Sequence, residues 1–333
     1  FHSNYYATDE SLYMICANKI ANGGIQYVDT WDNKPPLLIW FYSFFAWMFG
    51  SYGLTAIRIF TAFYTFFIAA LFNQLFVNYR FTTRFTILPG FLLLLLLATP
   101  WYAQELNAEI LMTLPMLMSV LLLIINYVFN QKDRFSLFWV GLFGGICVGF
   151  KYQGAFHVLA LFVSFLVLTS PRPAALLTFL QGLLIPVISI LLVLYFTRSF
   201  EEFLDIGFLY NFDYMRVGAN PGEVVSWAGG IFEYLKIWNI FIFVGIWGVF
   251  HFRTRFFSYS ISQRKIETVM LIWLISSILA VLLCPLFYSS HSTFTVLCHH
   301  YFRIQNIKWN QKLYSDYRND FSGRNFQLIL LLL

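Results

Sequence analysis

Two acidic pairs are the side chains of this chain best placed to do chemistry. Asp9 and Glu10 are adjacent, and Glu105 and Glu109 are four residues apart, a spacing that puts both on one face of a helix. A carboxylate at such a position can act as a general base toward a hydroxyl group or hold a divalent cation. The alternative is structural, because acidic residues in a first helical turn interact favourably with the helix dipole.

Three cations could bind an anionic ligand. Lys34 precedes a double proline, and Arg58 and Lys151 stand in apolar surroundings. Arginine can bind a phosphate group through its guanidinium fork, and lysine can bind it as a point charge. Both side chains can instead extend from an apolar segment to a membrane surface. Asp29 and Asp32 precede the same prolines, which suits either a substrate-facing loop or a solvated turn.

The elements that position these residues are apolar helices. The chain is 333 residues long, 59% hydrophobic and only 11% charged, a composition that a soluble core of this size does not need. Apolar runs predict membrane spans at about 54–77, 85–101, 109–129, 135–150, 152–168, 174–197, 236–252 and 268–288. The sequence therefore predicts an all-α, polytopic transmembrane helix bundle.

A shorter helix precedes the bundle. Thr8, followed by Asp9 and Glu10, is a typical helix start, and Gly23 and Gly24 are a typical end. We expect this helix to lie along the membrane surface, with Leu12, Ile15, Cys16 and Ile20 on its apolar side. The run 37–49 is short, and we expect it to rest at the interface or re-enter the membrane without crossing.

The placement of Lys and Arg predicts the orientation. If 37–49 does not cross, one side of the membrane receives most of the basic residues between spans, and that side should be the cytoplasm. These residues are Arg80, Arg84, Lys132, Arg134, Arg172, Arg253, Arg255, Arg264 and Lys265. Asp9, Glu109 and Lys151 then meet on the opposite, external face. The basic clusters mark topology, and they do not predict nucleic-acid binding.

We expect a single membrane-embedded domain over residues 1–333. It comprises an external juxtamembrane and active-site loop at 1–36, the transmembrane bundle at 37–288 and an irregular tail at 289–333. Both ends of the sequence look truncated, since the final apolar run, 326–333, is too short to span a bilayer. The four cysteines form no CxxC pair, and His299 and His300 have no third ligand at metal-site spacing.

Five segments in order resemble one enzyme class. TDESLYMICANKIANGG, QYVDTWDNKPPLLIW, LTAIRIFTAFY, ELNAEILMTLP and VGFKYQGAF cover about residues 5–160. Together they resemble the GT-C glycosyltransferases that use polyprenyl-phosphate sugars, especially bacterial members related to protein O-mannosyltransferases and to the aminoarabinose transferase of lipid A. The chain departs from that pattern in having no helix before Asp9 and no C-terminal periplasmic domain.

The resemblance implies roles for individual residues. Asp9 matches the catalytic or metal-associated aspartate of the first external loop, Glu10 its acidic neighbour, and Glu109 the acidic residue of the second external loop. Lys34 belongs to the family's KPP element and Arg58 matches the arginine of the following helix. We expect Asp9 to be the base, assisted by Glu109, and Arg58 and Lys151 to bind phosphate.

The implied reaction is sugar transfer from a polyprenyl-phosphate donor, with inversion at the sugar, to a lipid, glycan or protein acceptor. No cofactor is required, although Asp9 and Glu109 could share a divalent Mg²⁺ or Mn²⁺ ion. The implied location is the bacterial inner membrane, with the active site facing the periplasm or exterior. Two alternatives stay open: a secondary transporter or lipid flippase, because buried charges also mark transport paths, and a noncatalytic membrane scaffold.

Overall fold

The computed structural model describes residues 8–78, 106–128, 134–168, 173–211 and 261–282, and 87% of these residues are helical, with no β-strand among them. The expected spans 85–101 and 236–252, the tail 289–333, and the candidates Glu105, His299 and His300 lie outside them. The first two helices are α1 (Thr8–Ala21) and α2 (Pro36–Phe49), and the 3-10 turn η1 (Gly50–Tyr52) joins α2 to α3 (Gly53–Asn78).

The remaining helices, apart from the three-residue α9, correspond to expected apolar runs. They are α5 (Ala108–Val128), α6 (Arg134–Phe150), α7 (Gly154–Leu168), α8 (Pro173–Phe196), α9 (Phe200–Glu202) and α12 (Ile261–Leu282). A π-helical turn, η2 (Phe203–Leu209), follows α9. Helix α12 begins seven residues before the expected start at 268. Its first turns contain the charged residues Arg264 and Lys265, which the predicted apolar run did not include.

Local signals explain where the helices begin and end. Helix α1 begins at Thr8, and at its end Gly23, with φ of 93°, donates a backbone hydrogen bond to Ile20 while Gly24 donates one to Lys19. Pro36 stands at the first position of α2, where a missing N–H is harmless. Gly50, with φ of 55°, then ends α2 and turns the chain into α3.

Three helical stretches of the described residues are long and apolar enough to cross a membrane: Pro36–Asn73, Ala108–Asn126 and Pro173–Phe196. Phe135–Phe150 and Gly154–Leu168 are apolar but shorter. Large hydrophobic side chains are exposed along these helices, for example Phe63 and Phe66 on α3 and Leu192 on α8. The protein is therefore a membrane protein, because lipid is the solvent that such a surface needs.

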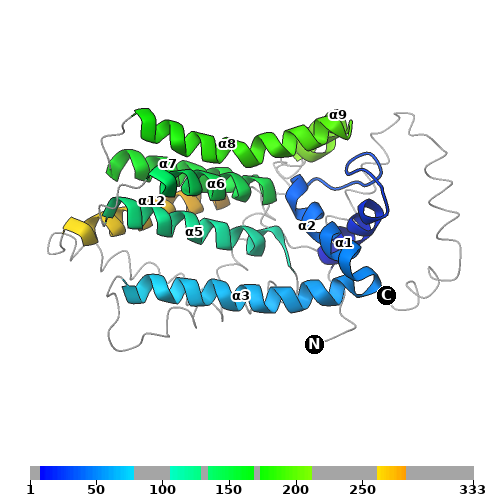
Figure 1. Cartoon of the computed structure of the whole chain (residues 1–333), viewed down its shortest axis with the longest axis horizontal. Coiled ribbons are helices and arrows are strands. Elements are labelled where there is room, and N and C mark those ends of the chain that lie inside the picture. Colours follow the sequence, from blue (N-terminus) through cyan, green and yellow to red (C-terminus); the bar gives the residue numbers. More distant parts are fainter. Residues whose placement is uncertain (1–7, 79–105, 129–133, 169–172, 212–260, 283–333) are drawn as a thin grey trace, which may run out of the picture.

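The long helices run along one direction, and α1 and α2 lie together at one end of them (Figure 1). Helix α6 packs against α5, α7 and α8, and α12 packs against α5 and α7. One core forms between these five helices and is centred on residues such as Val140, Phe165 and Phe179. A second core joins α1 and α2 to the first turns of α3 and α5.

Candidate functional site

The candidate site lies at the end of the bundle that carries α1 and α2, which we call the polar end. Helices α3 and α5 both begin at this end, and α5, α6, α7 and α8 alternate in direction, so the turn between α6 and α7 and the end of α8 also come to it (Figure 1). The loop 22–35 between α1 and α2 joins them there. All five segments that carry the family resemblance therefore contribute charged residues to one region.

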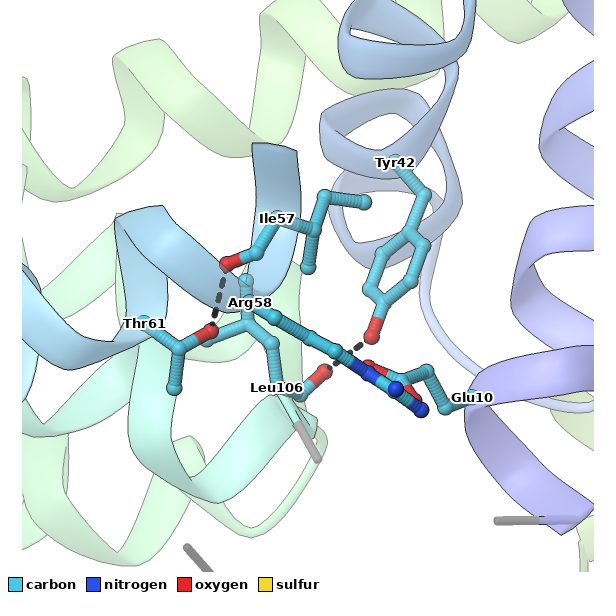
Figure 2. A network of polar contacts seen from close by, with 6 residues as sticks. All are labelled: Glu10, Tyr42, Ile57, Arg58, Thr61 and Leu106. Carbon is cyan, nitrogen blue, oxygen red and sulfur yellow. Dashed lines mark hydrogen bonds and ion pairs between the residues drawn. The ribbon is translucent and has the colours of Figure 1, made fainter. Parts of the chain in front are cut away.

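Glu10 and Arg58 form the first ion pair of the polar end. The Arg58 guanidinium donates from Nη2 to Glu10 Oε2 over 2.7 Å and from Nε to the same oxygen over 3.2 Å. Figure 2 shows the guanidinium of α3 directed at the carboxylate of α1. Glu10 is only 1% exposed, and burial raises its pKa while the hydrogen bond and charge of Arg58 oppose that rise.

Neighbouring hydrogen bonds hold the elements that carry this pair. Tyr42 of α2 donates its hydroxyl to the carbonyl of Leu106 over 2.6 Å, which ties α2 to the residues just before α5 (Figure 2). The Tyr42 ring also meets Tyr13 of α1 edge to face, with ring centroids 5.5 Å apart. The position of Glu10 is thus fixed from α1, α2 and α3 together.

Glu109 and Lys151 form the second ion pair. Glu109 is in the first turn of α5, and Lys151 follows directly on α6, where its N–H donates to the carbonyl of Cys147 over 3.0 Å. Asn107 accepts a hydrogen bond from the N–H of Ile110 over 3.1 Å and so caps the start of α5. The two cations expected to bind phosphate, Arg58 and Lys151, therefore each have a carboxylate partner.

Asp9 differs from both acidic residues discussed above. Its side chain is exposed, and among the described residues it forms no hydrogen bond or ion pair. The adjacent Glu10 is buried and paired, so the two members of the DE pair have different environments. Of the expected catalytic carboxylates Asp9, Glu10 and Glu109, Asp9 is the one that has neither a hydrogen bond nor an ion pair among the described residues.

Asp32 is a fourth carboxylate at the polar end, and its sequence position suited either a substrate-facing loop or a solvated turn. It is 2% exposed; its Oδ1 accepts the N–H of Lys34 over 3.1 Å, and its Oδ2 is buried without a hydrogen-bond partner. Burial raises the pKa of Asp32 to about 6; the charge of Lys34 lowers it and that of Asp9 adds to the rise. The sequence signal for this interaction is that Asp32 lies two residues before Lys34, where its carboxylate can accept the Lys34 N–H.

The charges of three carboxylates, Asp9, Asp32 and Glu109, act on Tyr13. Burial raises the pKa of the Tyr13 phenol well above its usual value, and the negative charges of these three residues raise it further. Asp9 and Glu109 therefore act on the same side chain although they are 100 positions apart. Among the described residues, however, no group of three or more His, Cys, Asp or Glu side chains is arranged to hold a metal ion.

The loop 22–35 is held by the segment that follows α8. Asn33 donates to Asn211 Oδ1 over 3.1 Å, and the Asn211 amide donates back to the Asn33 carbonyl over 3.0 Å. Tyr27 packs on Phe203 with ring centroids 5.5 Å apart and donates its hydroxyl to the carbonyl of Lys34 over 2.7 Å. These contacts fix the backbone of Lys34, a residue expected to bind the substrate.

A further contact reaches η2 from the turn between α6 and α7. Tyr152, next to Lys151, donates its hydroxyl to the carbonyl of Gly207 in η2. A Cβ at Gly207 would lie 2.8 Å from the Phe203 ring and 3.1 Å from the Tyr27 ring, so a larger residue there would displace these rings. Sequence reasoning did not single out Tyr152, although it lies within VGFKYQGAF, and it missed Asn211 and Gly207, which belong to none of the five segments.

The described part of the chain also has an open pocket at the opposite end of the bundle. It is lined by Val167, Leu168, Ile261, Arg264, Lys265 and Thr268, where α7 ends and α12 begins. Arg134, at the start of α6, comes to the same end (Figure 1). Arg134, Arg264 and Lys265 were expected on one side of the membrane, opposite to Asp9, and they are at the opposite end of the bundle.

Comparison of the chain with protein-family models, with curated proteins and with solved structures gives no match.

Proposed function

We propose that this protein is an integral membrane glycosyltransferase of the GT-C kind, which transfers a sugar from a polyprenyl-phosphate donor to a hydroxyl or amine of a lipid, glycan or protein acceptor. The observation that carries the proposal is the meeting of Asp9, Lys34, the Glu10–Arg58 pair and the Glu109–Lys151 pair at one end of an apolar bundle. A lipid-linked donor has its phosphate at the membrane surface, which is where such a cluster would meet it.

In the proposed reaction, the exposed Asp9 carboxylate takes the proton of the acceptor hydroxyl. The acceptor oxygen forms a bond to the anomeric carbon, and the bond from that carbon to the phosphate oxygen breaks. The polyprenyl phosphate leaves as an anion, and a single displacement inverts the sugar. Glu109 orients the acceptor, and no step of this scheme passes through a metal ion.

Cations stabilise the leaving phosphate in this scheme. Lys34, whose backbone is fixed by Asp32 and Tyr27, has only the Asn33 amide oxygen as a partner of its ammonium group among the described residues, at 3.2 Å. Arg58 and Lys151 are paired with carboxylates, so each would exchange or share its partner when phosphate binds. We therefore place Lys34 first among the phosphate-binding residues, ahead of Arg58 and Lys151.

The substitution Asp9→Asn tests the proposal. It keeps the size of the side chain and removes the base, and general-base catalysis typically contributes about 10²- to 10⁴-fold. We expect sugar transfer by the full-length protein in lipid vesicles, assayed on a panel of polyprenyl-phosphate sugars, to fall at least 100-fold.

Asp29→Asn is the matched control, because Asp29 is exposed on the loop 22–35 and accepts only the N–H of Ile25 over 2.7 Å. Its transfer rate should stay near that of the unmodified protein. Unchanged transfer by Asp9→Asn would remove Asp9 from the mechanism. Movement of a lipid-linked sugar across the vesicle membrane without transfer would favour the transporter alternative.

A further inference from the structure

A second group of polar side chains lies inside the bundle, among apolar residues. Ser119 of α5 and His157 of α7 are 0% and 3% exposed, and Trp273 of α12 stands beside His157 with ring centroids 5.9 Å apart. These three helices contact one another (Figure 1). Polar groups in the interior of a membrane protein are costly and for that reason mark sites with a purpose.

The hydrogen bonds of Ser119 determine which His157 nitrogen carries a proton. Ser119 Oγ is 2.7 Å from the carbonyl of Met116 and 2.7 Å from His157 Nε2. A hydroxyl has one proton, and the carbonyl can only accept, so the Ser119 proton goes to Met116. His157 Nε2 must then carry a hydrogen and donate it to Ser119 Oγ.

The other imidazole nitrogen is consequently an acceptor. His157 forms no ion pair among the described residues, and a buried charge without a counter-ion is strongly disfavoured, so the ring is neutral. A neutral imidazole has one N–H, which Nε2 already holds. Nδ1 therefore has a free lone pair, and it is buried without a hydrogen-bond partner.

Trp273 has a hydrogen-bond donor without an acceptor, whereas His157 has an acceptor without a donor. Its Nε1–H can only donate, and this nitrogen is likewise buried without a partner. Ser276, one turn further along α12, donates its hydroxyl to the carbonyl of Phe156 over 2.5 Å and fixes this part of α12 against the start of α7. A buried donor and a buried acceptor are thus held on adjacent rings, without a hydrogen bond between them.

We propose that one buried water molecule bridges Trp273 and His157. The water accepts the hydrogen bond of Trp273 Nε1–H and donates one to His157 Nδ1, which satisfies both groups at once. Buried waters in proteins typically join polar groups that would otherwise lack partners. The chain Trp273, water, His157, Ser119, Met116 then has a consistent direction of donation across α12, α7 and α5.

Nuclear magnetic resonance of the full-length protein in lipid nanodiscs, with ¹⁵N-labelled His and Trp, tests this proposal. We expect His157 to be protonated on Nε2 and unprotonated on Nδ1. We also expect magnetisation to transfer from water protons to Trp273 Nε1–H. Trp273→Phe should remove that signal and shift the Nδ1 resonance of His157. Trp47→Phe, at a ring that is 70% exposed on α2, is the control and should leave both unchanged.

Two results would overturn the water bridge: a proton on His157 Nδ1, or a Trp273 Nε1–H signal that receives no magnetisation from water. If Trp273→Phe does not fold, Trp273→Tyr keeps an aromatic ring and supplies the assignment. Ser119→Ala removes only a hydroxyl outside the bridge, so the water signal at Trp273 should persist in it, and its loss would also count against the proposal. None of these outcomes depends on glycosyltransferase activity.

Discussion

At the scale of single residues, neighbouring side chains of the same type have different environments. Asp9 is exposed and Glu10, the next residue, is 1% exposed and bound to Arg58. In a helix, adjacent positions are about 100° apart around the axis, so one can face a packed neighbour while the other faces solvent. A catalytic role for Asp9 is therefore compatible with a structural role for Glu10.

Removing one partner of the Glu10–Arg58 pair tests its structural role. Arg58→Gln leaves the buried Glu10 carboxylate without its cation, and we expect a loss of about 3 kcal/mol in the free energy of unfolding. Thermal or denaturant unfolding in detergent micelles measures it. The double variant Glu10→Gln/Arg58→Gln should recover most of the loss, and Lys19→Gln on the exposed face of α1 is the control. Equal stability of the single and double variants would contradict a paired, buried Glu10.

The raised pKa of the buried Asp32 predicts that the free energy of unfolding depends on pH. Its pKa in the folded protein is about 6, against 3.8 for the unperturbed group, so the folded state binds more protons than the unfolded state between these values. Stability from this residue is therefore fully present below about pH 4 and is lost as the pH rises through about 6.

Asp32→Asn should remove this dependence and stabilise the protein at pH 7, by an amount on the order of 3 kcal/mol. Unfolding curves recorded between pH 4 and pH 8 measure it, with Asp29→Asn as the exposed control. A variant with the same pH dependence as the unmodified protein would show that Asp32 is not the titrating group.

At the scale of elements, glycines allow two helices to approach closely. Gly141, Gly145 and Gly149 repeat every four residues on α6, the spacing that places them on one face. A Cβ at Gly141 would lie 2.0 Å from the Phe179 carbonyl of α8, and one at Gly182 of α8 would lie 2.0 Å from the Phe138 carbonyl. The contact between α6 and α8 is thus made by backbone against backbone.

A side chain at this contact should separate the two helices. Gly182→Val should destabilise the protein by more than about 3 kcal/mol, because backbone cannot move aside as a side chain can. Gly144→Ala is the control, since its nearest neighbours are side-chain atoms of Val158 and Leu161 at 3.3 and 3.5 Å. Thermal unfolding of the purified proteins in detergent compares them. Wild-type stability of Gly182→Val would mean that α6 and α8 are not packed this closely.

At the scale of the whole molecule, charge is divided between the two ends of an apolar bundle. Asp9, Asp32 and the two ion pairs are at the polar end, and Arg134, Arg264 and Lys265 are at the other. Helix α2, with 14 residues, is about 21 Å long, less than the roughly 30 Å of a bilayer core, and it lies with α1 at the polar end (Figure 1). That 37–49 does not cross the membrane stays a prediction.

Labelling from the two sides of the membrane tests that division. Cysteine introduced at Asp29 or Glu201, both exposed at the polar end, should react with a membrane-impermeant maleimide from one side only. Cysteine at Phe135, which is 65% exposed at the start of α6, should react only from the other side. The unmodified protein, whose Cys16 and Cys147 are buried, gives the background. Labelling of all three positions from one side would refute a bundle that crosses the membrane.

The sequence by itself determined the helices, because the free energy of apolar surface and of helix termini depends on local composition. Run length predicted α3, α5, α6, α7 and α8 to within about two residues, and Thr8 and Gly23 predicted both ends of α1. The apolar face of α1 was only partly right. Ile15 is 54% exposed, whereas Tyr13 and Ala17 are buried against α2.

Only the tertiary structure decided which charges meet. Glu10 pairs with Arg58 across 48 positions and Glu109 with Lys151 across 42, and Asp32 is buried in a loop that reads as solvated. Hydrophobic periodicity predicts which residues are buried, but it does not predict which helices pack against each other. The choice of partner and the burial of a loop depend on how several helices pack at once, and no single segment encodes that.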